Sequence, residues 1–155
     1  MRHTTCVLLD SDAEFRRCLR EWLERAGDIV VVGETQDKRK TEEIIAIQQP
    51  HVLLADLAAL GGVEGVARIA SHFPETRLII LHRQEEQADV LGALRQGAWG
   101  HLARETLSPK EVVEAIRAVA HGDAYLSPSI AGRLVEDVAR RLRERKSDKG
   151  KQFPG

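Results

Sequence analysis

The chain has 155 residues, of which 43% are hydrophobic and 30% are charged, and its formal net charge at pH 7 is −1. This length and composition are typical of one globular domain with a proper hydrophobic core. The apolar runs are far shorter than the ~20 residues needed to span a bilayer, and the polar residues after Met1 do not form a signal peptide. We therefore expect a cytoplasmic protein with no membrane partner.

Short apolar runs predict five strands, with amphipathic segments of helical spacing between them. In chain order, the predicted strands are Cys6–Leu9, Ile29–Val32, Val52–Ala55, Leu78–Leu81 and, more weakly, His101–Ala103. The first predicted helix ends at Gly27, the second spans about Arg39 to Gln49, the third about Val63 to Phe73, and the fourth about Glu85 to Gln96. A fifth predicted helix begins after the Ser108-Pro109 cap and ends at Gly122.

Continuous apolar strands that alternate with helices imply a parallel sheet covered by helices on both faces. Five such units indicate an α/β fold with a doubly wound, five-stranded parallel sheet. In sheets of this kind, ligands bind at the carboxyl ends of the strands. The residues at those ends are therefore the first candidates for a functional site.

Acidic residues follow two of the predicted strands. Asp10-Ser11-Asp12 comes after the first strand and Asp56 after the third, whereas His82 and Arg104 follow the fourth and fifth. Two carboxylates ~4 Å apart repel by roughly 4 kcal/mol at an effective dielectric constant of ~20. A cation is expected to offset this repulsion, and Mg²⁺ held by carboxylates and a backbone carbonyl is the natural candidate.

Segments spread over most of the chain share one further pattern. They are Val7 to Asp10, Asp28 to Glu34, Pro50 to Leu57, Phe73 to Arg77, Gly97 to Leu102, Ser108 to Gly122, and Tyr125 to Pro128. In this order and spacing they resemble the receiver domain of bacterial two-component response regulators, in particular the NarL/FixJ-type subgroup. The resemblance implies a flavodoxin-like fold with strand order 2-1-3-4-5. It also implies a role in phosphorelay signal transduction and transcription regulation rather than in enzyme catalysis.

The resemblance assigns roles to individual residues. Asp56 matches the family's phosphoacceptor, so a sensor histidine kinase is the implied phosphodonor. Asp10 matches one of two acids that hold Mg²⁺, together with Asp56 itself and the backbone carbonyl of Ala58. A metal of this kind would mask the charge of the carboxylate nucleophile and of the transferring phosphoryl group.

The second metal-binding acid of the family is replaced by Ser11. Asp12 follows at once and is a further candidate ligand, provided that the loop absorbs a shift of one residue. In the alternative interpretation, Ser11 or Asp12 caps the first helix and Glu14 completes a capping box. Either way, the sequence predicts weakened or absent Mg²⁺ binding.

Three other family positions also differ. His82 stands in place of the switch hydroxyl, and it is expected either to pair with Asp56, to cover it, or to project into solvent. His101 replaces the family's switch aromatic residue. Arg104 replaces a lysine; it keeps the positive charge and can contact the phosphoryl group, but its planar fork is no equivalent of an ammonium. We therefore expect an atypical receiver with slow phosphorylation or, alternatively, a phosphorylation-independent dimerisation and protein-interaction module.

The segment after the receiver predicts one more helix. Apolar residues recur from Ile130 to Leu142, after a Ser127-Pro128 start. This stripe is expected to pack on its own domain, on a second copy or on a following domain, and of these we expect a homodimer. We divide the chain into a receiver domain (1–126), an extension helix (127–146) and a disordered tail (147–155). The last segment is basic, but no helix-turn-helix follows, so we expect no DNA binding by this chain alone.

Overall fold

The computed structural model describes residues 3–152, and the side chains of residues 3–148. The chain divides into two compact units, Met1–Tyr125 and Leu126–Gly155. Each unit is described by itself below. No helix among the described residues is both long and apolar enough to cross a membrane.

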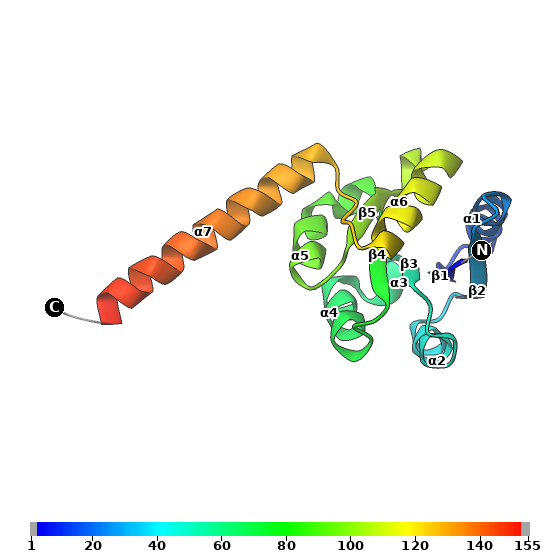
Figure 1. Ribbon diagram of the computed structural model, residues 1–155, viewed down its shortest axis with the longest axis horizontal. Coiled ribbons are helices and arrows are strands. Elements are labelled where there is room, and N and C mark those ends of the chain that lie inside the picture. The colour runs from blue at the N-terminus through cyan, green and yellow to red at the C-terminus, as the bar shows by residue number, and fades with distance from the viewer. Residues whose placement is uncertain (1–2, 153–155) are drawn as a thin grey trace. The chain divides into compact units, whose positions relative to one another are not determined.

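The first unit contains a five-stranded parallel sheet with the order β2-β1-β3-β4-β5, which confirms the predicted fold (Figure 1). Its strands are β1 (Thr4–Leu9), β2 (Ile29–Thr35), β3 (Val52–Asp56), β4 (Arg77–His82) and β5 (Gly100–Ala103). The strand order reverses next to β1, because β2 pairs on one side of it and β3 on the other. The carboxyl ends of β1 and β3 therefore meet at the switch point of the sheet, where such folds bind ligands.

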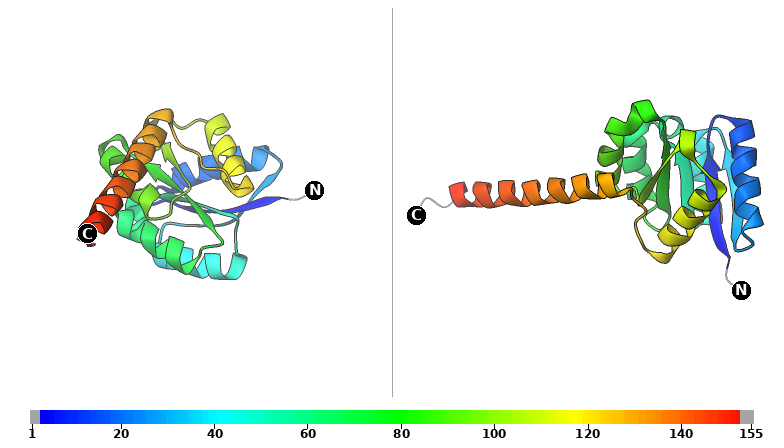
Figure 2. Two further views of the ribbon diagram at one scale, coloured as in Figure 1. Left: turned by 60° about the vertical axis from the view of Figure 1, so that its left-hand side comes forward. Right: turned by 90° about the horizontal axis from the view of Figure 1, so that it is seen from above.

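Helices cover both faces of the sheet (Figure 2). The helices α1 (Ala13–Arg25) and α6 (Pro109–His121) lie on one face, and α2 (Lys38–Gln48), α4 (Gly62–His72) and α5 (Val90–Arg95) lie on the other. The helix α6 begins as predicted, because the Ser108 hydroxyl accepts a hydrogen bond from the Glu111 N–H at 3.2 Å and Pro109 occupies the first turn.

The core of the first unit fills both sides of the sheet. Strands β3 and β4 are almost wholly buried, because helices cover both faces of these central strands. On the α1 and α6 side, the sheet packs against Leu19, Leu23, Val112, Ile116 and Val119. This packing holds the strand ends in fixed positions and thereby fixes the side chains that follow them.

Three short elements differ from the sequence prediction. The fourth helix is split into a 3₁₀ segment, η1 (Gln84–Asp89), and the α-helix α5. A one-turn helix, α3 (Leu57–Leu60), follows β3 directly, and a 3₁₀ turn, η2 (Arg104–Thr106), follows β5. All three lie just after strand ends, where short turns are decided by tertiary contacts rather than by apolar periodicity.

The second unit is dominated by one helix, α7 (Pro128–Gln152). The sequence predicted that the helix would end at residue 146 and that a disordered tail would follow. The structure instead continues the helix through residue 152, and no proline interrupts the chain before residue 154. The predicted tail at residues 153–155 lies outside the described residues.

Candidate functional site

Asp10 lies directly after β1 and is fully buried. Its backbone N–H donates to the Thr35 carbonyl at 3.1 Å, which continues the pairing of β1 with β2 past the strand end. One carboxylate oxygen, Oδ1, accepts a hydrogen bond from the Asp12 N–H at 2.9 Å. The other oxygen, Oδ2, pairs with the Arg104 guanidinium, which supplies the charged partner that a buried carboxylate requires.

Asp56 is the last residue of β3 and is only 1% exposed. Its Oδ2 accepts a hydrogen bond from the Ala59 N–H at 3.0 Å, because the one-turn helix α3 starts immediately after it. Burial raises the pKa of the Asp56 carboxyl above its ordinary value, and the nearby Asp10 carboxylate raises it further. The Ala59 N–H and two arginines act in the opposite direction. The carboxylate is thus held in place, but its charged form is disfavoured.

Arg104, at the start of η2, contacts all three acids of this region. Its Nη1 forms a short ion pair with Asp10 Oδ2 and lies 3.9 Å from Asp56 Oδ1. Its Nη2 lies 3.7 Å from Asp12 Oδ2. The guanidinium also stacks over the Phe15 ring, 3.8 Å from the ring centroid. Arg104 is therefore held on one side by an aromatic face and on the other by carboxylates.

A second arginine, Arg83, reaches Asp56 and was not among the predicted site residues. Its Nη1 lies 3.4 Å from Asp56 Oδ1 and 3.9 Å from Glu86 Oε1. Its backbone N–H donates to the same Glu86 oxygen at 2.9 Å, and this bond fixes the start of η1. One sequence signal pointed to Arg83, namely its position immediately after the strand-end residue His82. The sequence does not show, however, that the Arg83 side chain points back toward β3.

The loop after β1 settles how Ser11 and Asp12 are used. Asp12 caps α1, because its Oδ1 accepts hydrogen bonds from the N–H groups of Glu14 at 3.0 Å and Phe15 at 3.2 Å. Ser11 is exposed, and the structure shows Asp12, not Ser11, as the cap of α1. Of the two roles considered for Asp12, the structure shows the helix cap, and its other oxygen, Oδ2, lies 3.7 Å from Arg104 Nη2.

His82 and His101 lie on neighbouring strands and contact each other. The distance between His82 Nε2 and His101 Nδ1 is 3.1 Å, and the side chains are 2% and 8% exposed. The expectation that His82 might simply project into solvent is therefore wrong, because the end of β4 is covered. Burial and the neighbouring His82 lower the pKa of His101 to about 4. His101 is therefore neutral at neutral pH.

The arrangement of these residues does not fit a divalent metal ion. Within the described part of the chain, no group of three or more histidine, cysteine, aspartate or glutamate side chains is placed to hold a metal. The Ala58 carbonyl, which the sequence suggested as a ligand, accepts a hydrogen bond from the Gly61 N–H at 3.1 Å. The free oxygen of Asp10 is taken by Arg104. A cation is present at this place, but it is a guanidinium.

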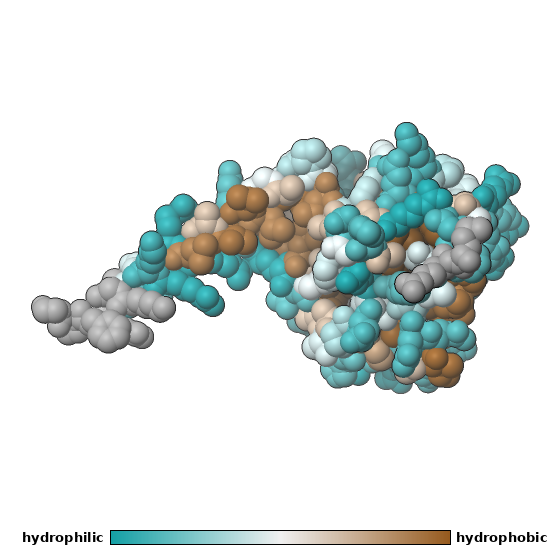
Figure 3. Space-filling view, in the orientation of Figure 1, coloured by the Kyte–Doolittle hydropathy of each residue, from teal (hydrophilic) through white to brown (hydrophobic). Residues whose placement is uncertain are grey.

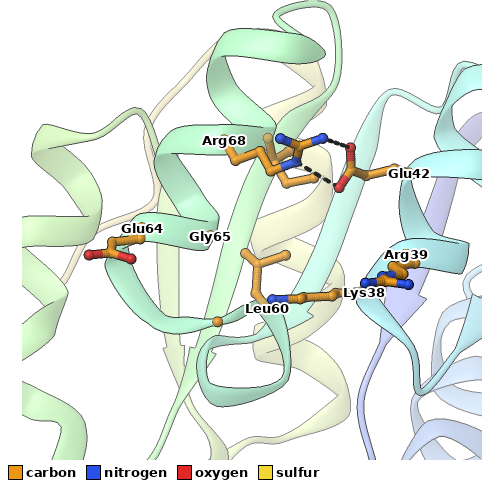
Figure 4. A pocket seen from close by; sticks show the side chains of 9 residues that line it. Lys38, Arg39, Glu42, Leu60, Glu64, Gly65 and Arg68 are labelled. Carbon is orange, nitrogen blue, oxygen red and sulfur yellow. Dashed lines mark hydrogen bonds and ion pairs between the residues drawn. The ribbon is translucent and has the colours of Figure 1, made fainter.

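A cavity of about 480 Å³ between α2 and α4 lies apart from these acids (Figure 4). Its main charged contact is the pairing of Arg68 with Glu42, in which Nε and Nη2 donate to the two carboxylate oxygens at 2.9 and 3.0 Å. None of the strand-end residues described above lines it. The candidate site is therefore the acidic cluster at the carboxyl ends of the strands and not this cavity.

Comparison with known proteins agrees with this fold. The family model of the response regulator receiver domain matches residues 6–117. The transcriptional regulatory protein NarL of Mycobacterium tuberculosis is 31% identical over 137 residues, which make up 87% of this chain and 63% of that protein. The chain thus spans less than two thirds of this relative.

Two solved structures have the same fold. The signal receiver domain of NarL from Mycobacterium tuberculosis has a TM-score of 0.72 and 31% identity, with 79% of this chain and 99% of that chain covered. RcsB, solved as two dimers bound to two parallel DNAs, has a TM-score of 0.75 at 22% identity over 86% of this chain and 68% of its own, and shows the fold alone. With the receiver model matching most of the chain and Asp56 at the end of β3, the chain belongs to the response-regulator receiver family, as a NarL-type receiver domain of two-component signalling.

Proposed function

We propose that this chain is an atypical receiver in which Asp56 is the phosphoacceptor but is phosphorylated slowly, and in which Mg²⁺ binds weakly or not at all. The observation that carries this proposal is the position of Arg104. Its guanidinium nitrogens lie within 3.9 Å of carboxylate oxygens of Asp10, Asp12 and Asp56.

Receiver domains generally bind Mg²⁺ at the acidic site, and Arg104 competes with any ion there. A divalent ion close to the guanidinium would be repelled by it, so Arg104 would first have to leave the fully buried Asp10. Breaking a buried ion pair in this way leaves an uncompensated charge and is strongly unfavourable. The ion would recover only part of that loss, because Ser11 does not supply the carboxylate that the family uses.

Asp56 is also restrained as a nucleophile. Phosphorylation by a sensor histidine kinase would break the P–N bond of the phosphohistidine and form a P–O bond to an Asp56 carboxylate oxygen. Both oxygens already have partners, since Oδ2 accepts the Ala59 N–H and Oδ1 faces Arg83 and Arg104. These contacts must rearrange before attack, so we expect a slow reaction with a sensor kinase as the phosphodonor.

We further propose that the chain acts in the cytoplasm as a homodimer. The exposed apolar side chains of α7 support this proposal, because a stripe of this kind favours a partner surface. RcsB, which shares the fold, is described as dimers bound to DNA. If phosphorylation proves absent, the same dimer would define the second candidate function, a phosphorylation-independent interaction module.

The test is incubation with acetyl phosphate and Mg²⁺, followed by intact mass measurement, with Asp56→Asn as the control. Beryllofluoride and tryptophan fluorescence give a second readout, since Trp99 adjoins β5. A slow, partial adduct that is lost in Asp56→Asn supports the proposal. No adduct and no Mg²⁺ response would favour the interaction module, and rapid stoichiometric modification would contradict the atypical reading.

A further inference from the structure

The helix α7 carries an apolar stripe that is exposed to solvent. Val135, Val138 and Leu142 are 68%, 50% and 57% exposed, whereas Ile130 is buried and Leu134 is half-buried. Spacings of three and four residues place the three exposed side chains on one face of the helix. Figure 3 shows apolar side chains gathered along this helix. We call these three residues the α7 stripe.

We propose that the α7 stripe binds the α7 stripe of a second copy of this chain, with the two helices antiparallel. This inference rests on the homodimer proposed above and names its surface and its geometry. It does not depend on whether Asp56 is phosphorylated.

The residues of the stripe fall on the seam positions of a coiled coil. With Val135 at position a of a heptad, Val138 is the following d and Leu142 the next a. The preceding seam position, a d position, is Ala131, which is half-buried, and the seam position that follows Leu142 is Arg145. The apolar seam is thus short and is bounded by a charge at its C-terminal end.

Charge disfavours a parallel pair in register. In that arrangement Arg145 would face Arg145 of the second copy within the seam. Arg141 at position g would lie beside Lys146 at position e of the second copy, again a pair of like charges. Like charges at such close range repel, although Arg141 also pairs with Asp137 of its own helix, with Nε 3.3 Å from Oδ2.

An antiparallel pair avoids both contacts. Val135 then lies opposite Val138 of the second copy, and Leu142 lies opposite Ala131, so the layers are all apolar. Arg145 lies beyond them, next to the start of the second helix near Pro128, where it meets no arginine. The helix dipoles also run in opposite directions, which is favourable. The avoidance of like-charge contacts therefore favours the antiparallel orientation.

Gly132 gives an independent indication of a close partner. It lies inside α7, where glycine lowers helix propensity, and a Cβ added there would meet nothing within 4 Å. Packing among the described residues therefore does not require a glycine at this position. In the antiparallel arrangement, Gly132 lies opposite Ala139 of the second copy, and two small residues allow the helices to approach closely.

The surface is tested by sedimentation velocity of the full chain over a range of concentrations. We expect Val138→Glu to weaken dimerisation at least tenfold, because it places two carboxylates in the apolar seam. The matched control is Ile47→Glu, which changes an apolar residue on α2 that is 79% exposed and outside the stripe. Circular dichroism of both variants checks that the helices are retained.

The orientation is tested by disulfide trapping in a Cys18→Ser background. The remaining native thiol, Cys6, is buried, and burial raises its pKa to about 12, so it does not react readily. Antiparallel helices hold the two Leu142 positions ~16 Å apart along the axis, beyond disulfide range. We therefore expect Leu142→Cys alone not to cross-link, but to form a disulfide when mixed with Ala131→Cys.

Each outcome has a distinct meaning. A wild-type chain that stays monomeric contradicts the homodimer and, with it, the α7 pairing. A dimer that Val138→Glu leaves intact keeps the homodimer but overturns the α7 surface. Rapid self-cross-linking of Leu142→Cys overturns the antiparallel orientation. A monomer that binds DNA or an acidic protein through α7 would show that the stripe serves another partner, and would also overturn the inference.

Discussion

The candidate site has two halves, which lie at the carboxyl ends of different strands and differ in their residues. At the ends of β1 and β3, the buried acids Asp10 and Asp56 occupy the places that the receiver pattern predicts. At the ends of β4 and β5, His82, His101 and Arg104 stand where the family has a hydroxyl, an aromatic ring and a lysine. The first half thus has the residue types that the resemblance implies, and the second half has different ones.

This contrast shows that two acids in the positions that the receiver pattern predicts can have neighbours that the pattern does not predict. The charge of Asp10 and Asp56 is unchanged, but the compensating cation comes from the protein through Arg104. At the end of β4, His82 contacts His101. Among the described side chains, no hydrogen bond joins His82 to Asp56. The groups around the Asp56 carboxylate, more than the carboxylate itself, determine how readily it ionises.

The largest expected effect is that of Arg104→Ala, which removes the cation from the acidic half. We expect a loss of about 3–5 kcal/mol in the free energy of unfolding, because buried Asp10 loses its ion-pair partner. Urea unfolding measures this loss, and Mg²⁺ should restore part of it in the variant while it leaves the wild type unchanged.

The control for Arg104→Ala is Arg117→Ala. Arg117 also pairs with an acid through two hydrogen bonds, to Asp28 at 2.8 and 2.9 Å, but both side chains are partly exposed. Its loss should therefore be no more than about 1 kcal/mol. Equal effects of the two variants would contradict the role given to burial.

The second prediction rebuilds the changed half. In Ser11→Asp combined with Arg104→Lys, a further carboxylate joins the acids and a compact ammonium replaces the planar guanidinium. We expect the Kd for Mg²⁺ to fall at least tenfold, or about 1.4 kcal/mol, in a titration followed by tryptophan fluorescence. Ser71→Asp with Arg104→Lys, which adds the same charge at an exposed position on α4, should not produce this change.

The third prediction concerns the pH dependence of the histidine pair. The pKa of His101 is lowered from 6.5 in the unfolded chain to about 4 in the fold, so the unfolded state binds more protons between these values. Its contribution to stability is therefore present above pH 6.5 and is lost as the pH falls toward 4.

Urea midpoints at pH 7.5, 5.5 and 4.5 measure this contribution. In His101→Phe, which keeps a buried aromatic ring without a titrating group, the decline over this range should be smaller than in the wild type. Identical pH profiles of the two proteins would show that protonation of His101 is not what destabilises the fold.

The smallest expected effect is that of Asp56→Asn. Because burial raises the pKa of Asp56, the folded state holds its proton to higher pH than the unfolded chain, and stability is lost as the pH rises through that window. The neutral amide should therefore make the chain slightly more stable at pH 7. Asp123→Asn, at an exposed position, is the control and should have no such effect; a destabilised Asp56→Asn would show that the pairs with Arg83 and Arg104 outweigh burial.

The sequence predicted the fold and the acidic half of the site well, for local reasons. Apolar runs and their spacing depend on which faces of each element are buried, so they predicted all five strands, whereas the order of the strands came from the family resemblance. Asp10 and Asp56 were found because each directly follows a buried strand. Arg83 was missed because its long side chain reaches a strand that is 27 positions away in sequence.

What the amino-acid sequence determined by itself is the scaffold, the acids at its edge and the identity of each changed residue. Only the tertiary structure decided how those changes are used. It placed Arg104 among three acids and over Phe15, paired His82 with His101, and assigned Asp12 to the helix cap. The physical reason is that a side chain that is long, or that has polar atoms on two sides, can contact several partners. Which partner it contacts depends on distances across the sheet that no local pattern encodes.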